Sequence, residues 1–424
     1  MQPNPATSDD LRKRNRATVI SAVRRHGEIS RTDLSHATGL SAATVTAITA
    51  GLIEQGVLNV PDKTPGERLG KGRPAVQLAV NASFATVCSV VLKYGEVSAQ
   101  LVDFTGRQLQ EIALPLNTIT TSTKAIRSAM IRCVKTLLTK TKGVTQIAKI
   151  VVGVQGSTDV DATTLLWSPV ITKWQLPIAQ WLSEEFDTTT TVFNDAAMIA
   201  YSLYVEQEGV YGQNFVAIML SSGVGMGLFR NGQLLGGTAS SGMEFGHMTY
   251  QAGGALCGCG RRGCIEAYAG YAAILRSANK QSPVSPLPDF VDTEDVRRTM
   301  NDALAGKTAA KNAIKQAGSA LGAGLCSLFA LFDTFPVAMV GPGTQAFDIM
   351  EEPIRAALRE SIAGLNDQEV VINCYPDEMP LLHRGCAFRA LHDLDITTAN
   401  DTAAVSKPAR AGKTVRQSAR RNAS

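Results

Sequence analysis

The sequence predicts an α/β protein preceded by a small helical segment, and two observations carry this prediction. Short helical patterns with serine caps fill most of residues 1–80, whereas buried strands alternate with helices over residues 81–396. A chain of 424 residues is long enough for two or three domains, and its 45 % hydrophobic content can form large cores. We therefore expect separate domains over residues 1–80 and 81–396, followed by a basic disordered tail over residues 397–424.

Charge is distributed unevenly along the chain. Residues 1–80 carry 11 basic and 7 acidic groups, and residues 402–424 carry six basic groups and no acidic one, so the part between them is acidic. Basic ends on an acidic body are typical of a protein whose ends contact a polyanion. For the tail, a disordered end with no partner stays open as the alternative.

The sequence contains no pattern that predicts a membrane span or a signal peptide. The longest apolar stretch without charge, residues 317–332, contains glycine and serine and ends at Asp333, so we expect a buried helix there. The first ten residues are polar, and no apolar segment follows them. These observations predict a cytoplasmic protein with no membrane partner.

Three short helices are predicted near the N-terminus, in the order and spacing of a helix-turn-helix. The first covers residues 11–25, Ser30 caps the second, and Ser41 caps the third after a turn at residues 38–40. The outward positions of the third helix are small or hydroxylated, which allows close approach to base edges in a major groove. We expect DNA contacts from Ser41, Ala42, Ala43, Thr44, Thr46 and Ala47.

A β-hairpin is predicted after the third helix. Residues 57–60 and 75–78 have strand patterns, and a basic segment rich in turn residues joins them, as in the wing of a winged helix. Arg73 lies between glycine and proline, which keep the backbone slim enough for a minor-groove contact. The alternative is a packing subdomain without DNA contacts. The agreement of caps, turn, outward residues and basic wing favours DNA binding.

Regular elements follow one another through the body. Strand patterns cover residues 87–92, 97–104, 147–154 and 190–193, and helical patterns cover residues 125–140 and 195–204. Glycines mark several strand ends, and ligands of α/β folds usually bind at such ends. We therefore expect a ligand-binding cleft in the body.

Two segments of the body have ambiguous patterns. Asn194 and Asp195 lie at a strand-to-helix junction, where the amide can hydrogen-bond a hydroxyl and the carboxylate can accept a proton from one. A helix cap explains the same two residues, and the pair alone favours the cap. The glycine-rich residues 221–227 could present backbone N–H groups to a phosphate or could simply form a hairpin bend.

The most specific pattern of the chain is a histidine followed by three closely spaced cysteines. Three thiolates and one imidazole form the tetrahedral donor set of a structural zinc site, and the glycines between them let the loop 247–264 wrap one ion. Four protein ligands leave no position for water, so we expect structural rather than catalytic Zn²⁺. The predicted ligands are His247, Cys257, Cys259 and Cys264.

Two carboxylates flank this loop. Glu244 precedes His247 by three residues, and Glu266 follows the last cysteine by two, so folding the loop around a metal should bring both carboxylates together. Carboxylates beside Asn194 and Asp195 would form a pocket for a polyhydroxyl compound.

The order of these motifs resembles that of the ROK family of repressors and sugar kinases, above all its Mlc- and NagC-type winged-helix transcriptional branch. The resemblance covers residues 10 to 396 and implies an actin-like (ribonuclease H-like) ATPase body with two lobes that dimerises. It also implies sugar contacts from Asn194, Asp195, Glu244, His247 and Glu266, with Asp195 at the position of the kinases' catalytic base. The zinc ligands of the family coincide with His247 and the three cysteines.

Departures from the kinases of this family predict that the body is not an enzyme. The kinases open the body with Asp-x-Gly-Gly-Thr, which holds magnesium and phosphate, but this chain has Val91 and Lys93-Tyr94-Gly95 there. Without this clasp, phosphoryl transfer loses its main electrostatic support. Ser168-Pro169-Val170 also replaces the Ser-Pro-Asn of many relatives, which changes the pocket for the usual sugars.

The sequence therefore predicts a DNA-binding transcriptional regulator, a repressor of carbohydrate genes that responds to a small sugar effector. We expect it to bind a palindromic operator in double-stranded DNA as a homodimer or a higher homo-oligomer. One alternative is a sugar kinase with an appended DNA-binding domain, which the altered clasp disfavours. A second is a protein-docking regulator with a vestigial sugar pocket, which the intact set of Asn, Asp, Glu and His disfavours.

Overall fold

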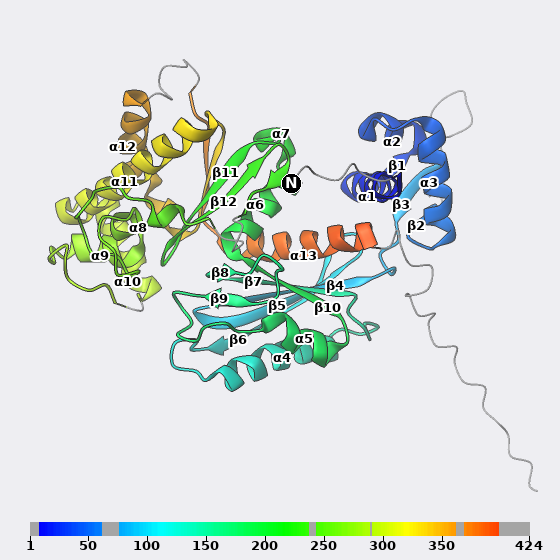
Figure 1. Cartoon of the computed structure of the whole chain (residues 1–424), viewed down its shortest axis with the longest axis horizontal. Coiled ribbons are helices and arrows are strands. Elements are labelled where there is room, and N and C mark those ends of the chain that lie inside the picture. Colours follow the sequence, from blue (N-terminus) through cyan, green and yellow to red (C-terminus); the bar gives the residue numbers. More distant parts are fainter. Residues whose placement is uncertain (1–7, 62–75, 237–242, 289–290, 362–368, 398–424) are drawn as a thin grey trace, which may run out of the picture.

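The computed structural model of the chain describes residues 8–61, 76–236, 243–288, 291–361 and 369–397. Arg73 and the predicted tail from residue 398 onward lie outside these residues. A small N-terminal unit stands beside a body of two lobes, and helix α13 (Glu378–Thr397) runs between the lobes toward that unit (Figure 1).

The N-terminal unit contains three helices and a three-stranded sheet. Ser30 and Ser41 cap the second and third helices, because their side chains accept hydrogen bonds from the backbone N–H groups of Asp33 and Thr44. The strand order is β1-β3-β2, so the expected hairpin of β2 and β3 gains an additional short strand from the turn before α2. The elements are α1 (Ser8–His26), β1 (Glu28–Ser30), α2 (Arg31–Thr38), α3 (Ala42–Glu54), β2 (Leu58–Asn59) and β3 (Gln77–Val80).

The first lobe is a five-stranded sheet of order β10-β7-β4-β5-β6 with a buried layer on each face. Residues on one side of β4 pack against α4 and α5, and those on the other side pack toward α13, which explains the nearly continuous apolar run of this strand. The elements are β4 (Thr86–Lys93), β5 (Gly95–Asp103), β6 (Gln108–Leu116), α4 (Thr123–Lys140), β7 (Lys149–Val154), β8 (Ser157–Thr158), β9 (Leu165–Trp167), α5 (Ile178–Phe186) and β10 (Thr189–Asn194).

The second lobe is another five-stranded sheet, of order β13-β12-β11-β14-β15, with a group of helices on one face. Helix α6 (Asp195–Glu206) packs against β12 and against α13, so it lies between the lobes. The other elements are α7 (Glu208–Tyr211), β11 (Phe215–Leu220), β12 (Val224–Arg230), β13 (Gln233–Leu234), η1 (Phe245–His247), α8 (Glu266–Ala269), α9 (Tyr271–Ala278), α10 (Thr293–Leu304), α11 (Thr308–Phe332), β14 (Val337–Val340), η2 (Pro342–Ala346), α12 (Phe347–Glu360) and β15 (Ile372–Tyr375).

Helix α11 is the one helix, within the described residues, that is long and apolar enough by itself to cross a membrane. More than half of its most apolar window, 56 %, is buried inside the structure, where α11 packs against α9 and α12. Helices α2 and α3 pass the same test only as a pair bent by 115°. Helix α11 thus contains the buried helix predicted over residues 317–332.

The N-terminal unit is attached to the body through the far end of α13. Arg24 of α1 makes two hydrogen bonds to the carboxylate of Asp395, at 2.7 and 2.8 Å. Its third guanidinium nitrogen, Nε, donates to the carbonyl of Phe104, and the guanidinium lies 4.8 Å from the centre of the Phe104 ring. One helix therefore contacts both the N-terminal unit and the interior of the body.

Candidate functional site

A cavity of about 430 Å³ lies between the two lobes. Its volume falls in the range of about 300–1,000 Å³ that is usual for small-molecule sites. The walls come from the end of β4, the start of α6, the β11–β12 turn and the start of α13. The loop 247–264, which carries the predicted metal ligands and is called the metal loop below, also contributes. The polar residues that line it include Lys93, Gln155, Asp195, Ser222, His247, Glu266 and Glu378.

Asp195 lies in the wall of this cavity, as the first residue of α6. Its Oδ1 atom accepts a hydrogen bond from the N–H of Ala196 at 2.8 Å, and the residue is 7 % exposed. Burial raises the pKa of Asp195 to about 7; Glu378 adds to this rise, and Lys93 opposes it. Near neutral pH, this carboxyl group can therefore either accept or donate a hydrogen bond to a ligand hydroxyl.

Asn194 serves as the cap of α6 in this structure. Its Oδ1 atom accepts from the N–H of Ala197 at 3.1 Å, and its Nδ2 donates to the carbonyl of Gly156 at 2.9 Å. Both ends of the amide are used by backbone groups, and Asn194 is not among the described residues that line the cavity. The capping interpretation of the Asn-Asp pair therefore describes its geometry, and Asn194 holds the start of α6 next to Asp195.

Glu266 also lines the cavity, as the first residue of α8. Its Oε2 atom accepts from the N–H of Val224 at 3.0 Å, and Oε1 lies 3.6 Å from the Cys257 sulfur. A Cβ atom on Gly223 would lie 2.6 Å from Oε2, so a residue with a side chain there would displace the carboxylate from this position. The glycine-rich segment at residues 221–227 thus forms a hairpin bend that holds an acidic side chain.

Glu244 lies at the margin of the site. Its side chain is 54 % exposed, and Oε2 is 3.9 Å from Nε2 of His247. Glu244 is not among the described residues that line the cavity, whereas His247 is. The metal loop therefore brings His247 and Glu266 to the cavity but leaves Glu244 beside it.

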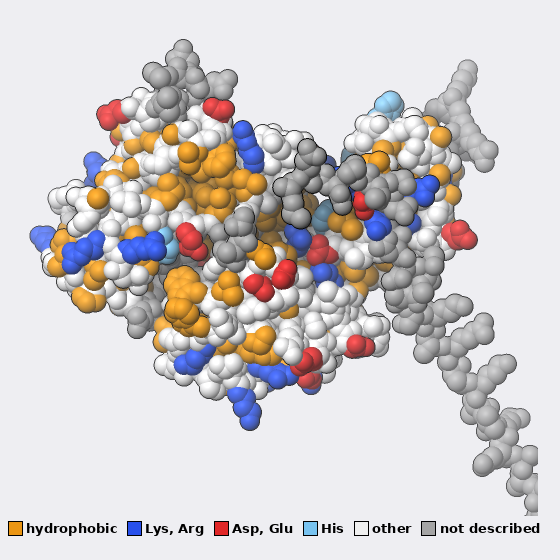
Figure 2. Space-filling view, viewed as in Figure 1, with side chains coloured by type: hydrophobic (Ala, Val, Ile, Leu, Met, Phe, Trp, Pro, Cys, Tyr) orange, Lys and Arg blue, Asp and Glu red, His pale blue; other side chains and the backbone are white. Residues whose placement is uncertain are grey.

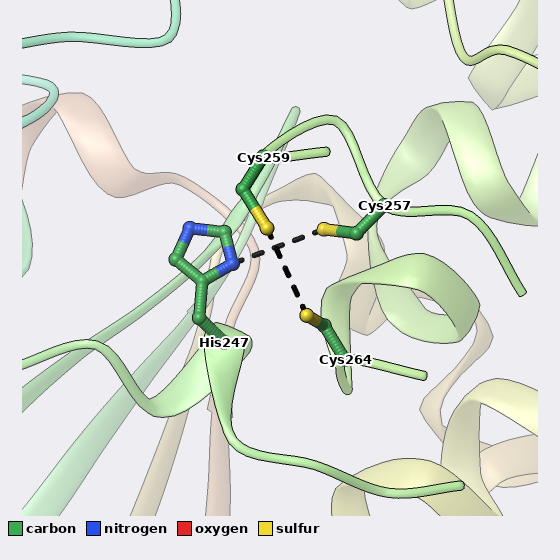
Figure 3. A group of neighbouring side chains, drawn as sticks. All are labelled: His247, Cys257, Cys259 and Cys264. Carbon is green, nitrogen blue, oxygen red and sulfur yellow. Dashed lines mark hydrogen bonds between the residues drawn. The ribbon is translucent and has the colours of Figure 1, made fainter. Parts of the chain in front are cut away.

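The histidine and the three cysteines converge on one point (Figure 3). Nδ1 of His247 lies 3.8 Å from Sγ of Cys257, and Sγ of Cys259 lies 3.8 Å from Sγ of Cys264. A zinc ion with sulfur ligands at about 2.3 Å requires separations of about 3.8 Å along the edges of its tetrahedron. All four ligand atoms lie within 4.8 Å of one another, so the residues fit a tetrahedral metal ion.

Without a cation, the buried thiols of the cluster stay protonated. Burial raises the pKa of the Cys257 and Cys264 thiols, and nearby Glu266 raises both further. A divalent metal ion would compensate the charge of these thiolates. His247 begins the loop, Glu266 follows its last cysteine by two residues, and both line the cavity, so a metal here would fix one wall of it.

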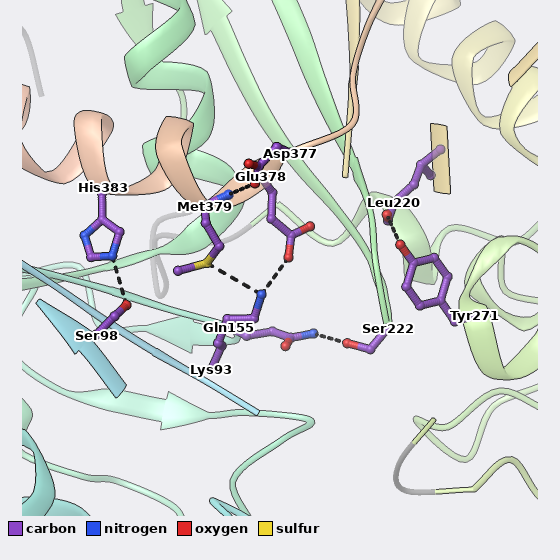
Figure 4. A network of polar contacts seen from close by, with 10 residues as sticks. All are labelled: Lys93, Ser98, Gln155, Leu220, Ser222, Tyr271, Asp377, Glu378, Met379 and His383. Carbon is purple, nitrogen blue, oxygen red and sulfur yellow. Dashed lines mark hydrogen bonds and ion pairs between the residues drawn. The ribbon is translucent and has the colours of Figure 1, made fainter. Parts of the chain in front are cut away.

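The corner of the cavity near the start of α13 holds an ion pair that the sequence motifs do not indicate (Figure 4). Nζ of Lys93 lies 2.9 Å from Oε1 of Glu378 and 3.6 Å from Sδ of Met379. Gln155 donates to Ser222 at 2.9 Å and so links the two lobes beside this pair. Lys93 stands out in the sequence only as a departure from a kinase motif, and no local pattern marks Glu378.

The predicted DNA-reading helix α3 lies at the surface of the N-terminal unit. Ala42, Ala43, Thr46 and Ala47 are exposed, and Thr44 is half-buried. The hydroxyl groups of Ser41 and Thr44 bond each other at 2.8 Å, and the Thr46 hydroxyl donates to the carbonyl of Ala42. Because these side chains are small, they project little from α3, and the helix can approach DNA closely.

Comparison with known proteins gives matches over most of the chain. A model described as the ROK family matches residues 95–378. The chain is 25 % identical to the xylose repressor of Caldicellulosiruptor bescii over 387 residues, which cover 86 % of this chain and 95 % of that protein. It is 24 % identical over 355 residues to the DNA-binding transcriptional dual regulator NagC of Escherichia coli, covering 82 % and 86 %.

The likeness extends to kinases and to solved structures. A glucokinase of Streptomyces coelicolor is 27 % identical over 233 residues, 52 % of this chain and 73 % of that protein. The crystal structure of a ROK family transcriptional regulator, a homolog of the E. coli MLC protein, matches with a TM-score of 0.76 and 22 % identity, covering 92 % of this chain and 98 % of that chain. This likeness confirms the predicted fold class, because it includes the N-terminal helices and both lobes.

Proposed function

The chain belongs to the ROK family, and from that membership we propose that it is a sugar-responsive transcriptional repressor. The observation that carries this proposal is the coverage of the relatives. Those that match along nearly the whole chain are repressors or regulators, whereas the glucokinase matches about half of it. A DNA-reading unit joined to a body with a polar cavity is the architecture that such a function requires.

The DNA partner in this proposal is a palindromic operator in double-stranded DNA. One short reading helix offers too few base contacts for useful specificity, so a homodimer or higher homo-oligomer has to place two copies of α3 on two half-sites. Acidic and basic side chains are interspersed over the described part of the body in Figure 2, so this face of the body offers no single-sign field for DNA. We expect the DNA contacts from Arg73 and from the outward residues of α3 and its cap, which are Ser41, Ala42, Ala43, Thr44, Thr46 and Ala47. Because an operator-binding protein has to reach chromosomal DNA, we propose a cytoplasmic location.

The sugar contacts in this proposal come from the two walls of the cavity. Asp195, His247 and Glu266 present acceptors and a ring nitrogen to it. Asn194 supports Asp195 through its cap, and Glu244 would reach a ligand by rotation of its exposed side chain. Together these residues suit a polyhydroxyl effector.

We further propose that the body does not transfer phosphate. Val91 is fully buried, and the ammonium group of Lys93 is bound to Glu378 where the family's kinases place a metal- and phosphate-holding motif. A carboxylate in that corner would repel the phosphates of a nucleotide. The relatives alone do not distinguish a kinase from a protein without kinase activity, because they include both repressors and kinases.

Zn²⁺ is the metal that we propose for the cluster of His247 and the three cysteines. Cys257→Ser should lower the metal content from about one ion per chain to background and should also weaken the sugar response, because the loop positions Glu266. Elemental analysis of purified protein measures the metal content, and Cys374→Ser, at an exposed cysteine outside the cluster, is the matched control. Wild-type protein that contains no zinc after purification would refute this assignment.

The experiment that tests the function combines operator selection with a sugar panel. DNA selected from random duplexes by the full-length protein should contain an inverted repeat with half-site centres about 10 base pairs apart or a multiple of this. Xylose, glucose and N-acetylglucosamine, together with xylose 5-phosphate, glucose 6-phosphate and N-acetylglucosamine 6-phosphate, are then tested for release of the labelled operator in fluorescence anisotropy. Selection of no common sequence would refute the DNA-binding role, and a selected operator that no sugar releases would refute the sugar response.

A further inference from the structure

A polar atom without a partner lies in the corner of the cavity at the start of α13. Glu378 is the first residue of α13, lines the cavity and is 8 % exposed. Its Oε1 atom accepts from Lys93, but Oε2 has no hydrogen-bond partner among the described residues. Buried carboxylate oxygens are almost always paired in folded proteins, because an unpaired one loses its hydration without compensation. This atom therefore marks a place where a hydrogen-bond donor is missing.

The backbone of Gly341 lies close to Oε2. A Cβ atom at Gly341 would lie 2.9 Å from Oε2, so a residue with a side chain would crowd the carboxylate. The backbone φ of Gly341 is 108°, which also favours glycine at this position. The loop between β14 and η2 thus approaches the carboxylate with backbone alone.

Lys93 supplies the complementary donor. Its ammonium group has three N–H donors, of which one is given to Glu378 and one faces the weak acceptor Sδ of Met379. The Lys93 side chain is 31 % exposed and lines the cavity. A hydroxyl group in this corner would accept from Nζ of Lys93, and a rotation of the Glu378 carboxylate that turns its enclosed Oε2 atom toward the cavity would let the same hydroxyl donate to it.

The charges of the cavity decide between an uncharged ligand and an anionic one. Asp195, Glu266 and Glu378 are all lining residues, whereas Lys93 is the one lysine or arginine among the described residues that line it. A phosphate ester would bring two further negative charges next to these carboxylates. A hydroxyl group brings none.

On the basis of the proposed function, we propose that the Lys93–Glu378 pair is a second contact point for the effector, which takes a hydroxyl group of an uncharged sugar and rejects a phosphate ester. The position of the pair also links this contact to DNA binding. Glu378 begins α13, and Asp395 in the last turn of the same helix holds Arg24 of the N-terminal unit. A ligand held at Glu378 therefore acts on the helix to which the DNA-reading unit is attached.

The test uses full-length protein and the sugar panel defined above, with dissociation constants measured by isothermal titration calorimetry. Wild-type protein should bind the neutral sugar that releases the operator at least about tenfold more tightly than its phosphate ester. Glu378→Gln removes the charge of the acceptor but keeps its size, and we expect it to weaken binding of the neutral sugar about tenfold. The operator-release concentration should rise by a similar factor.

Two further variants complete the design. Glu351→Gln removes a carboxylate that pairs with Arg355 on α12, and it serves as the control that keeps the wild-type dissociation constant. If Glu378→Gln does not fold, the double variant Lys93→Met with Glu378→Met removes both charges and should show the same loss of affinity.

The outcomes separate this inference from the proposed function. Unchanged sugar affinity in the folded Glu378 variants, or a phosphate ester that binds as tightly as its neutral sugar, would overturn the inference while the sugar response stands. If no sugar of the panel binds wild-type protein that still binds its selected operator, the proposed sugar response fails, and this inference fails with it.

Discussion

The two ends of α13 each carry a buried carboxylate that is paired with a base from a distant part of the chain, but only one of the pairs is complete. At the C-terminal end, both oxygens of Asp395 accept from Arg24, and the remaining guanidinium nitrogen Nε donates to a backbone carbonyl. At the N-terminal end, Lys93 satisfies one oxygen of Glu378 and leaves the other without a partner among the described residues.

This difference separates a structural pair from one that is available to a ligand. The Arg24 and Asp395 side chains also border a cavity, but they are only 11 % and 1 % exposed, and both carboxylate oxygens and all three guanidinium nitrogens already make a hydrogen bond. The Lys93 side chain is 31 % exposed and faces a cavity. A buried polar group that is left unpaired reduces stability, and proteins tolerate this cost mainly where function requires it.

The largest effect is expected when the complete pair is broken. Arg24→Met would leave the Asp395 carboxylate buried without its cation, and removal of one partner from a buried pair typically costs about 3–5 kcal/mol. We expect a loss of this size in the free energy of unfolding, measured by urea denaturation. Burial already raises the pKa of Asp395 while Arg24 opposes this rise, so the variant should bind a proton there more readily.

The neighbouring arginine provides the control for this measurement. Arg25 pairs with Glu208 on the surface, where the side chains are 51 % and 59 % exposed, so Arg25→Met should cost less than about 1 kcal/mol. If Arg24→Met cost as little as Arg25→Met, the comparison would fail. The buried pair would then stabilise the protein no more than the surface pair does.

Local motifs made one side of the cavity predictable from the sequence. The four metal ligands lie within residues 247–264, and their chemical types define the donor set before any fold is known. The caps Ser30 and Ser41 are equally local, because each bonds a residue three positions later. Hydrophobic periodicity likewise predicted β4, β5, β7, β10 and α4 of the first lobe, but β6 and α5 were not predicted.

The pairs of α13 could not be predicted in this way. Lys93 and Glu378 are 285 positions apart, and Arg24 and Asp395 are 371 positions apart, so only the folded topology brings them together. The role of Asn194 could not be predicted either, because a helix cap and a ligand contact share one sequence pattern. At Glu244, spacing along the loop did not reveal that the side chain points outside the cavity.

The last prediction concerns Asp195, whose carboxyl group interacts with the incomplete Lys93–Glu378 pair. The pKa of Asp195 is raised from 3.8 to about 7, first by burial and then by Glu378. Between these two values the unfolded chain loses the proton while the folded chain keeps it, so the free energy of unfolding falls as the pH rises from about 4 to 7. The penalty that remains above pH 7 is roughly 4 kcal/mol by linkage.

Asp195→Asn should remove this penalty, because an amide does not ionise. We expect the variant and the wild type to have similar stability near pH 4, and the variant to be more stable at pH 8, in urea denaturation at both pH values. Asp161→Asn, at an exposed carboxylate, should keep the wild-type pH profile. If Asp195→Asn also kept that profile, the α6 carboxylate would be ionised in the folded protein, and the negative charge facing a ligand at Glu378 would be larger by one.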